Sequence, residues 1–98
     1  MRDTLGDDFV TLLESFFSDC EKYPARLNHH LENNDASGFC DLAHEIKGSA
    51  GLLGLAAISD CANVWEELSK SNQFPDPKHV TQDFPQLVAA TRSAVGNQ

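Results

Sequence analysis

The chain has 98 residues, of which 41% are hydrophobic, and 15 acidic against 7 basic side chains give it a formal charge of −8. This length suits a single domain, expected to span residues 1–98, with one modest hydrophobic core. The acidic balance opposes nonspecific binding to nucleic acid or to anionic membranes, and no apolar window is long enough to span a bilayer.

The first predicted helical segment spans Leu5 to Leu31. Its apolar residues recur every three or four positions, the spacing that places side chains on one helical face. They are Leu5, Phe9, Leu12, Leu13, Phe16, Cys20, Tyr23, Leu27 and Leu31. Because Pro24 lacks an amide donor and disfavours helical geometry at Tyr23, the segment is predicted to be kinked or split there.

A second helix is predicted from Ala36 to about Leu53. Asp35 is the expected N-cap, since its carboxylate can accept hydrogen bonds from the free amides that follow. Gly54 is the expected stop. The apolar residues have the 4-3-4-3 spacing of a bundle seam, and they are Phe39, Ala43, Ile46, Ala50 and Leu53.

A third helix is predicted from about Ala56 to Ser69, and the short connection makes it an antiparallel neighbour of the second. Its expected inward residues are Ile58, Cys61, Ala62, Trp65 and Leu68. A loop follows over residues 71–77. Within it, Asp76 and Pro77 are typical of an N-cap and of the first position of a helix.

The fourth predicted helix carries an apolar stripe that runs through Pro85, so we expect a kink or two abutting pieces there. The stripe consists of Val80, Phe84, Leu87, Val88, Thr91 and Val95. No strand-like alternation is found. The predicted fold is all-α, an antiparallel up-down four-helix bundle with a kinked or split N-terminal helix, and a monomer is expected because the stripes can be buried internally.

Residues 43–51 combine a histidine, a lysine and two glycines on one predicted helix. A glycine costs about 1 kcal/mol relative to alanine within a helix. Helical geometry places His44 on the solvent side, with Gly48 and Gly51 further along that side and Lys47 at its flank. These glycines therefore suggest that access to His44 matters more here than helix stability.

An exposed imidazole keeps a free lone pair in its neutral form, so His44 can act as a nucleophile. If a phosphoryl group were attached to it, the nearby ammonium of Lys47 could stabilise the added negative charge. Gly48 and Gly51 leave room for a second protein to approach closely.

The sequence from His44 to Gly54, HEIKGSAGLLG, resembles the H-x-[LI]-K-G-[SA]-[AS]-x-x-x-G signature of histidine-containing phosphotransfer (HPt) domains of multistep two-component phosphorelays. The likeness continues through Ile58, Ala62, Trp65 and Glu66, where that family usually shows L-x-x-x-C-x-x-L-E. Ala62 and Trp65 depart from the usual cysteine and leucine, which affects packing rather than chemistry.

The resemblance implies a phosphocarrier rather than an autonomous enzyme. His44 would accept a phosphoryl group on Nε2 from the aspartyl phosphate of a receiver domain and pass it to another receiver. Response-regulator receiver domains and a hybrid sensor histidine kinase are the implied partners. No cofactor of its own is implied, Mg²⁺ is expected on the partner receiver, and the chain has no glycine-rich nucleotide-binding loop.

The surface around His44 is expected to serve as a docking site that mixes apolar and polar side chains from the second helix and the N-terminal helix. The candidates on the second helix are Cys40, Asp41, Gly48, Gly51 and Leu52. The sequence does not specify which residues of the N-terminal helix lie beside them.

Other interpretations remain open at this stage. Lys47 could simply pair with Asp41 or Glu45 on an exposed face. The whole domain could be a noncatalytic HPt-like adaptor that binds a receiver or kinase without phosphotransfer, although an adaptor needs neither His44 nor Lys47. A weaker alternative is a metal-binding bundle that uses histidine and cysteine side chains.

The remaining histidines and the cysteines are not expected to be metal ligands or redox centres. His29, His30 and His79 are expected at the surface. The three cysteines, Cys20, Cys40 and Cys61, form no C-x-x-C pair, so neither a disulfide framework nor a zinc site is expected. Reduced thiols and the lack of an apolar signal segment predict a cytoplasmic location.

Overall fold

The computed structural model describes residues 4–96, with side chains from 9 to 94. The elements in chain order are α1 (Thr4–Cys20), α2 (Tyr23–Glu32), α3 (Ala36–Leu52), α4 (Ala56–Lys70), the π-helical turn η1 (His79–Asp83) and α5 (Phe84–Gly96). No strand is found within these residues, so the predicted all-α bundle is confirmed. The predicted core positions Leu5 and Val95 lie outside the described side chains.

The break in the N-terminal helix lies where the sequence predicts it. α1 ends at Cys20, and α2 begins at Tyr23 after a two-residue turn. Pro24 lies in the first turn of α2, where its missing amide donor costs no intrahelical hydrogen bond. The predicted split is therefore confirmed.

Helices α2, α3 and α4 are each followed by a residue with left-handed backbone geometry. These residues are Asn34, Gly54 and Asn72, with φ of 54°, 77° and 59°. After Gly54 the amide of Leu55 donates to the carbonyl of Ala50 at 2.8 Å, which is the long hydrogen bond of a Schellman motif. Glycine and asparagine are the residues that tolerate this geometry best.

Asp35 caps the start of α3, as predicted. Its Oδ1 accepts a hydrogen bond from the amide of Gly38 at 2.9 Å, and its Oδ2 lies 3.1 Å from Nδ1 of His30. The hydrogen bond from Gly38 and, after it, the contact with His30 lower the pKa of Asp35. A Cβ at Gly38 would collide with both side chains, so the glycine makes room for this cap.

We expect the Asp35→Ala variant to melt about 4–8 °C below the wild type near neutral pH, because it loses the N-cap of α3. Folding lowers the pKa of Asp35, so the contribution of its carboxylate is present above the ordinary value of 3.8 and is lost as the pH falls through the lowered value. Thermal unfolding followed by circular dichroism at about pH 7 and about pH 2 checks both parts. The deficit of the variant should shrink in acid, and equal melting temperatures near neutral pH would contradict the prediction.

The last helical segment begins at Pro77 and contains a π turn immediately before Pro85. In η1 the amide of Phe84 donates to the carbonyl of His79, five residues earlier. A kink or a break was expected near Pro85, and the helix has a π turn there. Val80 within this turn and Phe84 directly after it are both essentially fully buried.

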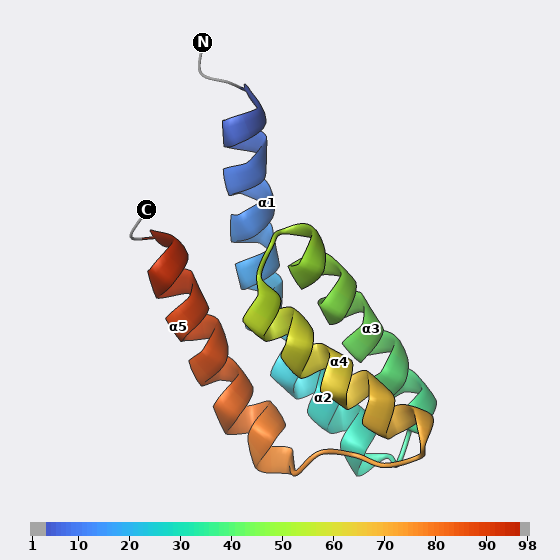
Figure 1. Ribbon diagram of the computed structural model, residues 1–98. Coiled ribbons are helices and arrows are strands. Elements are labelled where there is room, and N and C mark those ends of the chain that lie inside the picture. Colours follow the sequence, from blue (N-terminus) through green and yellow to red (C-terminus); the bar gives the residue numbers. More distant parts are fainter. Residues whose placement is uncertain (1–3, 97–98) are drawn as a thin grey trace.

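The core is centred on α3 and α4, which pack side by side (Figure 1). The ring of Phe39 lies in an edge-on arrangement against two aromatic rings, 6.1 Å from Trp65 and 5.6 Å from Phe74 between centroids. Most predicted stripe positions of these two helices are buried, namely Phe39, Ala43, Ile46, Ala50, Ile58, Ala62 and Trp65. Leu53, Cys61 and Leu68 are half-buried.

The stripe prediction was wrong at the N-terminal part of α1. Phe9 and Leu12 are 45% and 54% exposed. Figure 1 shows the first half of α1 extending beyond the other helices, so this part of the helix has few neighbours to pack against. Phe17, which the stripe did not include, is buried where α1 meets α5.

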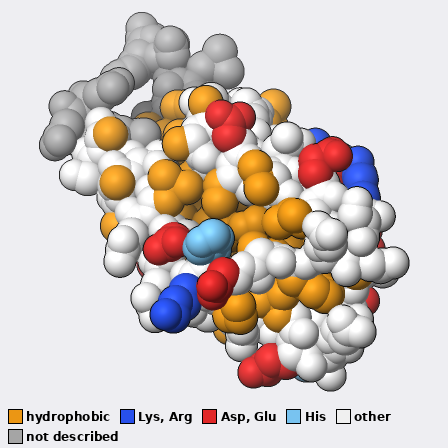
Figure 2. All heavy atoms as spheres, turned by 60° about the horizontal axis from the view of Figure 1, so that its bottom comes forward, with side chains coloured by type: hydrophobic (Ala, Val, Ile, Leu, Met, Phe, Trp, Pro, Cys, Tyr) orange, Lys and Arg blue, Asp and Glu red, His pale blue; other side chains and the backbone are white. Residues whose placement is uncertain are grey.

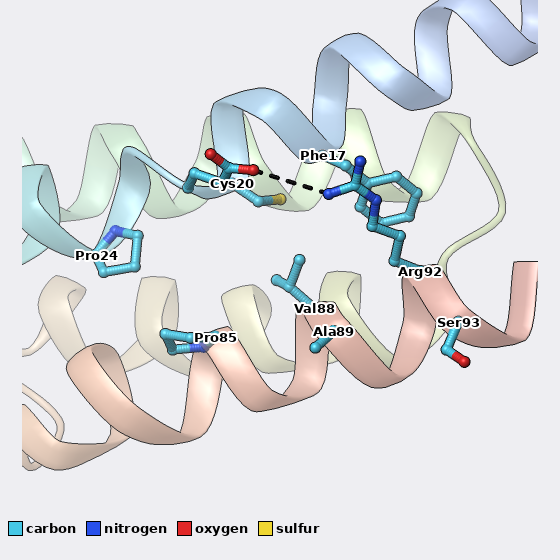
Figure 3. Close-up of a pocket in the computed structure, with 9 residues that line it drawn as sticks. Phe17, Cys20, Pro24, Pro85, Val88, Ala89, Arg92 and Ser93 are labelled. Atoms are coloured by element: carbon cyan, nitrogen blue, oxygen red, sulfur yellow. Dashed lines mark ion pairs between the residues drawn. The ribbon is translucent and has the colours of Figure 1, made fainter. Parts of the chain in front are cut away.

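A groove of about 560 Å³ separates the α1–α2 junction from α5. Figure 3 shows Pro24 on one wall and Pro85 and Val88 on the other. Arg92 reaches across from α5, where its Nη1 lies 3.8 Å from Oε2 of Glu21 and its guanidinium lies 5.7 Å from the centre of the Phe17 ring. This ion pair and cation–π contact join α5 to α1 across the groove.

Candidate functional site

His44 lies on the solvent side of α3, and its side chain is 68% exposed. Ala43 and Ile46, beside it in the sequence, are fully buried, so the helix orientation agrees with the predicted stripe. Nδ1 of His44 lies 3.0 Å from Oε2 of Glu66 on α4. The two residues meet because α3 and α4 pack together on either side of the short turn at residues 53–55.

Glu66 determines which nitrogen of His44 is free. Its side chain is only 7% exposed, yet its pKa is lowered, first by the hydrogen bond from Lys47 and then by the one with His44, against an opposing effect of burial. An ionised carboxylate has no hydrogen to donate, so Nδ1 of His44 must carry the shared hydrogen. Nε2 is left with a free lone pair on an exposed ring.

Lys47 pairs with Glu66 and not with the acidic residues suggested as alternatives. Its Nζ lies 2.7 Å from Oε1 of Glu66 and donates to Oδ1 of Asn63 at 3.3 Å. An ammonium has three N–H donors, so two contacts leave one donor for a further acceptor. Glu45 instead accepts from the hydroxyl of Tyr23 at 3.5 Å.

Lys70 is a second ammonium beside the same carboxylate. Its Nζ lies 3.6 Å from Oε2 of Glu66 and 3.6 Å from Oε2 of Glu67. These two carboxylates, Glu67 first, raise the pKa of Lys70. Glu66 is thus the point at which His44, Lys47 and Lys70 converge.

The two glycines of α3 occupy different surroundings. A Cβ added at Gly48 would meet nothing within 4 Å, whereas one at Gly51 would lie 3.6 Å from Oγ of Ser59 on α4. The Ser59 hydroxyl in turn donates to the carbonyl of Lys47 at 3.2 Å. Gly48 therefore lies beside open space, while Gly51 lies at the edge of the α3–α4 contact.

We expect Gly48→Ala to stabilise the fold by about 1 kcal/mol, because alanine favours a helix and the added methyl group meets no neighbour. Urea unfolding followed by circular dichroism measures the difference. Gly54→Ala is the control, since φ of 77° at Gly54 strains any other residue and should make that variant less stable. A Gly48→Ala protein less stable than the wild type would show that the glycine serves folding.

The predicted docking residues form part of an exposed surface on α3. Asp41 is exposed, Cys40 is half-buried and Leu52 is 83% exposed. Beside Leu52, a groove of about 170 Å³ runs between α3 and α1, and it is lined by Leu12, Ser15, Phe16, Asp19, Ser49, Leu52 and Leu53. Leu12, Ser15, Phe16 and Asp19 are thus the α1 residues that lie beside this end of α3.

Exposed apolar atoms alone do not mark a docking site on this protein. Figure 2 shows hydrophobic side chains reaching the surface in patches between polar and charged ones, which is common for soluble proteins. The α1–α3 surface differs because Leu52 lies on the same helix as His44 and two turns beyond it. This surface is therefore a docking candidate only because it adjoins His44 on the same helix.

Sequence reasoning missed the role of Glu66. The residue was noted only as part of a pattern, whereas the structure places it against the side chains of His44 and Lys47. A signal did exist, because Glu66 follows Ala62 by four residues and Trp65 by one, and both are expected on the inward side of the helix. A carboxylate on the buried side of a helix requires a partner.

The other histidines and the cysteines are the remaining candidates for metal ligands and reactive thiols among the described residues. In the part of the chain that the structure describes, no three His, Cys, Asp or Glu side chains are grouped so that they could hold a metal ion. Burial raises the pKa of the Cys20 thiol to about 12 and also raises that of Cys61, so neither is a reactive thiolate. Over the same residues, no helix is both long and apolar enough to cross a membrane.

Comparison with known proteins assigns a family to nearly the whole chain. The family model described as Hpt domain matches residues 11–94. This span contains His44, Lys47, Glu66 and Lys70. No curated protein and no solved structure gives a significant match.

Proposed function

Because the chain belongs to the Hpt domain family, whose members are phosphocarriers of two-component phosphorelays, we propose that His44 accepts a phosphoryl group from the aspartyl phosphate of one receiver domain and passes it to another. The observation that carries the proposal is the hydrogen bond from His44 to the nearly buried carboxylate of Glu66. It leaves Nε2 as an exposed nucleophile.

The proposed transfer needs no proton to leave His44. The Nε2 lone pair attacks phosphorus and forms the N–P bond, while the bond from phosphorus to the receiver aspartate breaks and its electron pair stays on that carboxylate. The imidazole ring gains positive charge and keeps its hydrogen on Nδ1. The negative charge of Glu66, 3.0 Å from Nδ1, stabilises this ring, and the reverse steps return the phosphoryl group to a second receiver.

Lys47 is proposed to stabilise the phosphoryl group during transfer. It lies one helical turn from His44, and its contacts with Glu66 and Asn63 hold the ammonium beside the ring. Its third N–H donor can bind a phosphoryl oxygen. The chain itself supplies no nucleotide site in this scheme, and Mg²⁺ would be held by acidic residues of the receiver.

Hpt domains interact with receiver domains and kinases, and we propose that this chain docks receivers, including that of a hybrid sensor kinase, on the surface around His44. Asp41, Gly48 and Leu52 would contact the partner from α3, with Leu12 contributing from α1. The open space beside Gly48 allows the close approach that in-line transfer requires. The cytoplasmic location predicted from the sequence is part of the same proposal.

An adaptor that binds without transferring phosphate is not favoured. Burying a carboxylate is costly unless it is paired, yet Glu66 is held where it orients His44 and Lys47. A surface that only docks a partner needs no such arrangement.

We expect the wild-type protein to gain one acid-labile phosphoryl group when mixed with a phosphorylated receiver domain, and His44→Gln to gain none. Intact-mass analysis before and after acid treatment measures the transfer. Binding of the unphosphorylated receiver to both proteins, followed by calorimetry, separates the adaptor alternative. Equal labelling of wild type and His44→Gln, or no labelling of wild type by a receiver that it binds, would refute the proposal.

A further inference from the structure

Two lysines, Lys47 and Lys70, lie close to the carboxylate of Glu66. Lys47 contacts Oε1 at 2.7 Å and is 31% exposed, whereas Lys70 lies 3.6 Å from Oε2 and is 56% exposed. The first distance is that of a close ion pair, and the second is that of a looser one. Lys70 is therefore close enough to feel the carboxylate but is not bonded to it.

Lys70 is shared between two carboxylates. Its Nζ lies 3.6 Å from Oε2 of Glu66 and 3.6 Å from Oε2 of Glu67. Both glutamates precede Lys70 on α4 by about one helical turn. Glu67 is 63% exposed, so water weakens its attraction for the ammonium. The nearly buried Glu66 is the stronger attractor once its other partner withdraws. Cys40, from α3, is the remaining titratable group near this ammonium.

A phosphoryl group on His44 would disturb this balance. Its negative charge attracts the whole ammonium of Lys47, and a movement of the ammonium toward the phosphoryl oxygens lengthens its 2.7 Å contact with Glu66. A carboxylate that is 7% exposed and loses its cation tends to take up a proton. A protonated Glu66 would no longer act as a purely accepting, negative partner of the His44 ring.

We propose that Lys70 is a positioning residue that takes the place of Lys47 against Glu66 when Lys47 turns to the phosphoryl group. The short shift from the shared position keeps Glu66 ionised, so the carboxylate continues to hold Nδ1–H of His44 through both halves of the transfer. This role rests on the proposed function and extends it to a residue outside the HEIKGSAGLLG motif.

The test is a double-mutant cycle of Lys47→Met and Lys70→Met in which the pKa of Glu66 is measured. The side-chain carboxyl resonance of Glu66 is titrated by carbon-detected NMR in wild type, both single variants and the double variant. We expect Lys70→Met to raise the titration midpoint slightly in the wild-type background and by roughly one pH unit when Lys47 is absent, because Lys70 then moves onto the carboxylate. Equal shifts in both backgrounds, or no shift, would overturn the proposal.

Transfer rates from a phosphorylated receiver provide the second readout. Lys70→Met should slow transfer by about threefold alone and by about tenfold in the Lys47→Met background, with Lys70→Arg restoring the wild-type rate. Lys78→Met, which removes an equal charge ahead of η1, is the matched control and should change neither readout. If the wild type takes up no phosphoryl group, the proposed function fails, while the NMR cycle still decides the role of Lys70.

Discussion

Glu66→Ala is expected to slow phosphoryl transfer to His44 by about 10- to 100-fold, the range found when the partner that orients a metal-binding histidine is removed. Without the carboxylate, either ring nitrogen can carry the hydrogen, the ring can rotate, and the positive charge formed during attack is no longer stabilised. Lys47 also loses its 2.7 Å contact and is less well held beside the ring. The rate is measured by mixing the protein with a phosphorylated receiver, quenching samples at successive times and determining the phosphorylated fraction by mass analysis.

Two variants show which property of Glu66 matters. Glu66→Gln keeps an oxygen that can accept from Nδ1–H but has no charge, so an intermediate rate indicates separate contributions from orientation and charge. Asp60→Ala removes an exposed carboxylate from the same helix and should transfer at the wild-type rate. A Glu66→Ala rate equal to that of Asp60→Ala, with the fold intact by circular dichroism, would contradict the role given to Glu66.

The lowered pKa of Glu66 predicts that the protein loses stability in acid. Folding lowers the pKa of Glu66, so its contribution to stability is present above the ordinary value of 4.5 and is lost as the pH falls through the lowered value. Glu66→Gln should lack this part of the acid dependence, because its amide does not titrate.

Phe39→Ala is expected to lower the free energy of unfolding by about 3–5 kcal/mol, a large share of the 5–15 kcal/mol typical of small domains. Phe39 is fully buried, and its ring contacts Trp65 and Phe74, so truncation leaves a cavity among three structural segments. Urea unfolding followed by circular dichroism gives the difference. Phe9→Ala is the matched control, because Phe9 is 45% exposed and the same truncation should cost about 1 kcal/mol or less. Similar losses in both variants would place the core elsewhere.

The sequence was sufficient to predict most of α3 and α4 because their apolar residues repeat with helical spacing and their ends carry strong signals, such as Asp35 and Gly54. It was not sufficient for Phe9 and Leu12. Periodicity shows which side chains share a face, but burial also depends on how far the neighbouring helices extend, and α1 outreaches them. Asn34 and Asn72 were missed as left-handed residues because asparagine adopts that geometry less regularly than glycine.

The sequence was sufficient to predict the residues of the candidate site that lie on α3, but not those that α4 contributes. His44, Lys47 and Gly48 lie within five residues, so helical geometry alone places them on neighbouring parts of one surface. Glu66 is 22 residues from His44 in sequence, and Lys70 is further. Their proximity to His44 depends on how α4 is rotated against α3, which the apolar stripes alone do not fix.

The turns at the two ends of α3 have a mechanical consequence. Three residues, 33–35, join α2 to α3, and three more, 53–55, join α3 to α4, and backbone hydrogen bonds hold both connections. A helix anchored this closely at both ends can neither slide nor tilt far without unfolding a neighbour. Under the proposed function, a receiver would meet a preformed surface, and discrimination among receivers would depend on shape and surface side chains rather than on adaptation by α3.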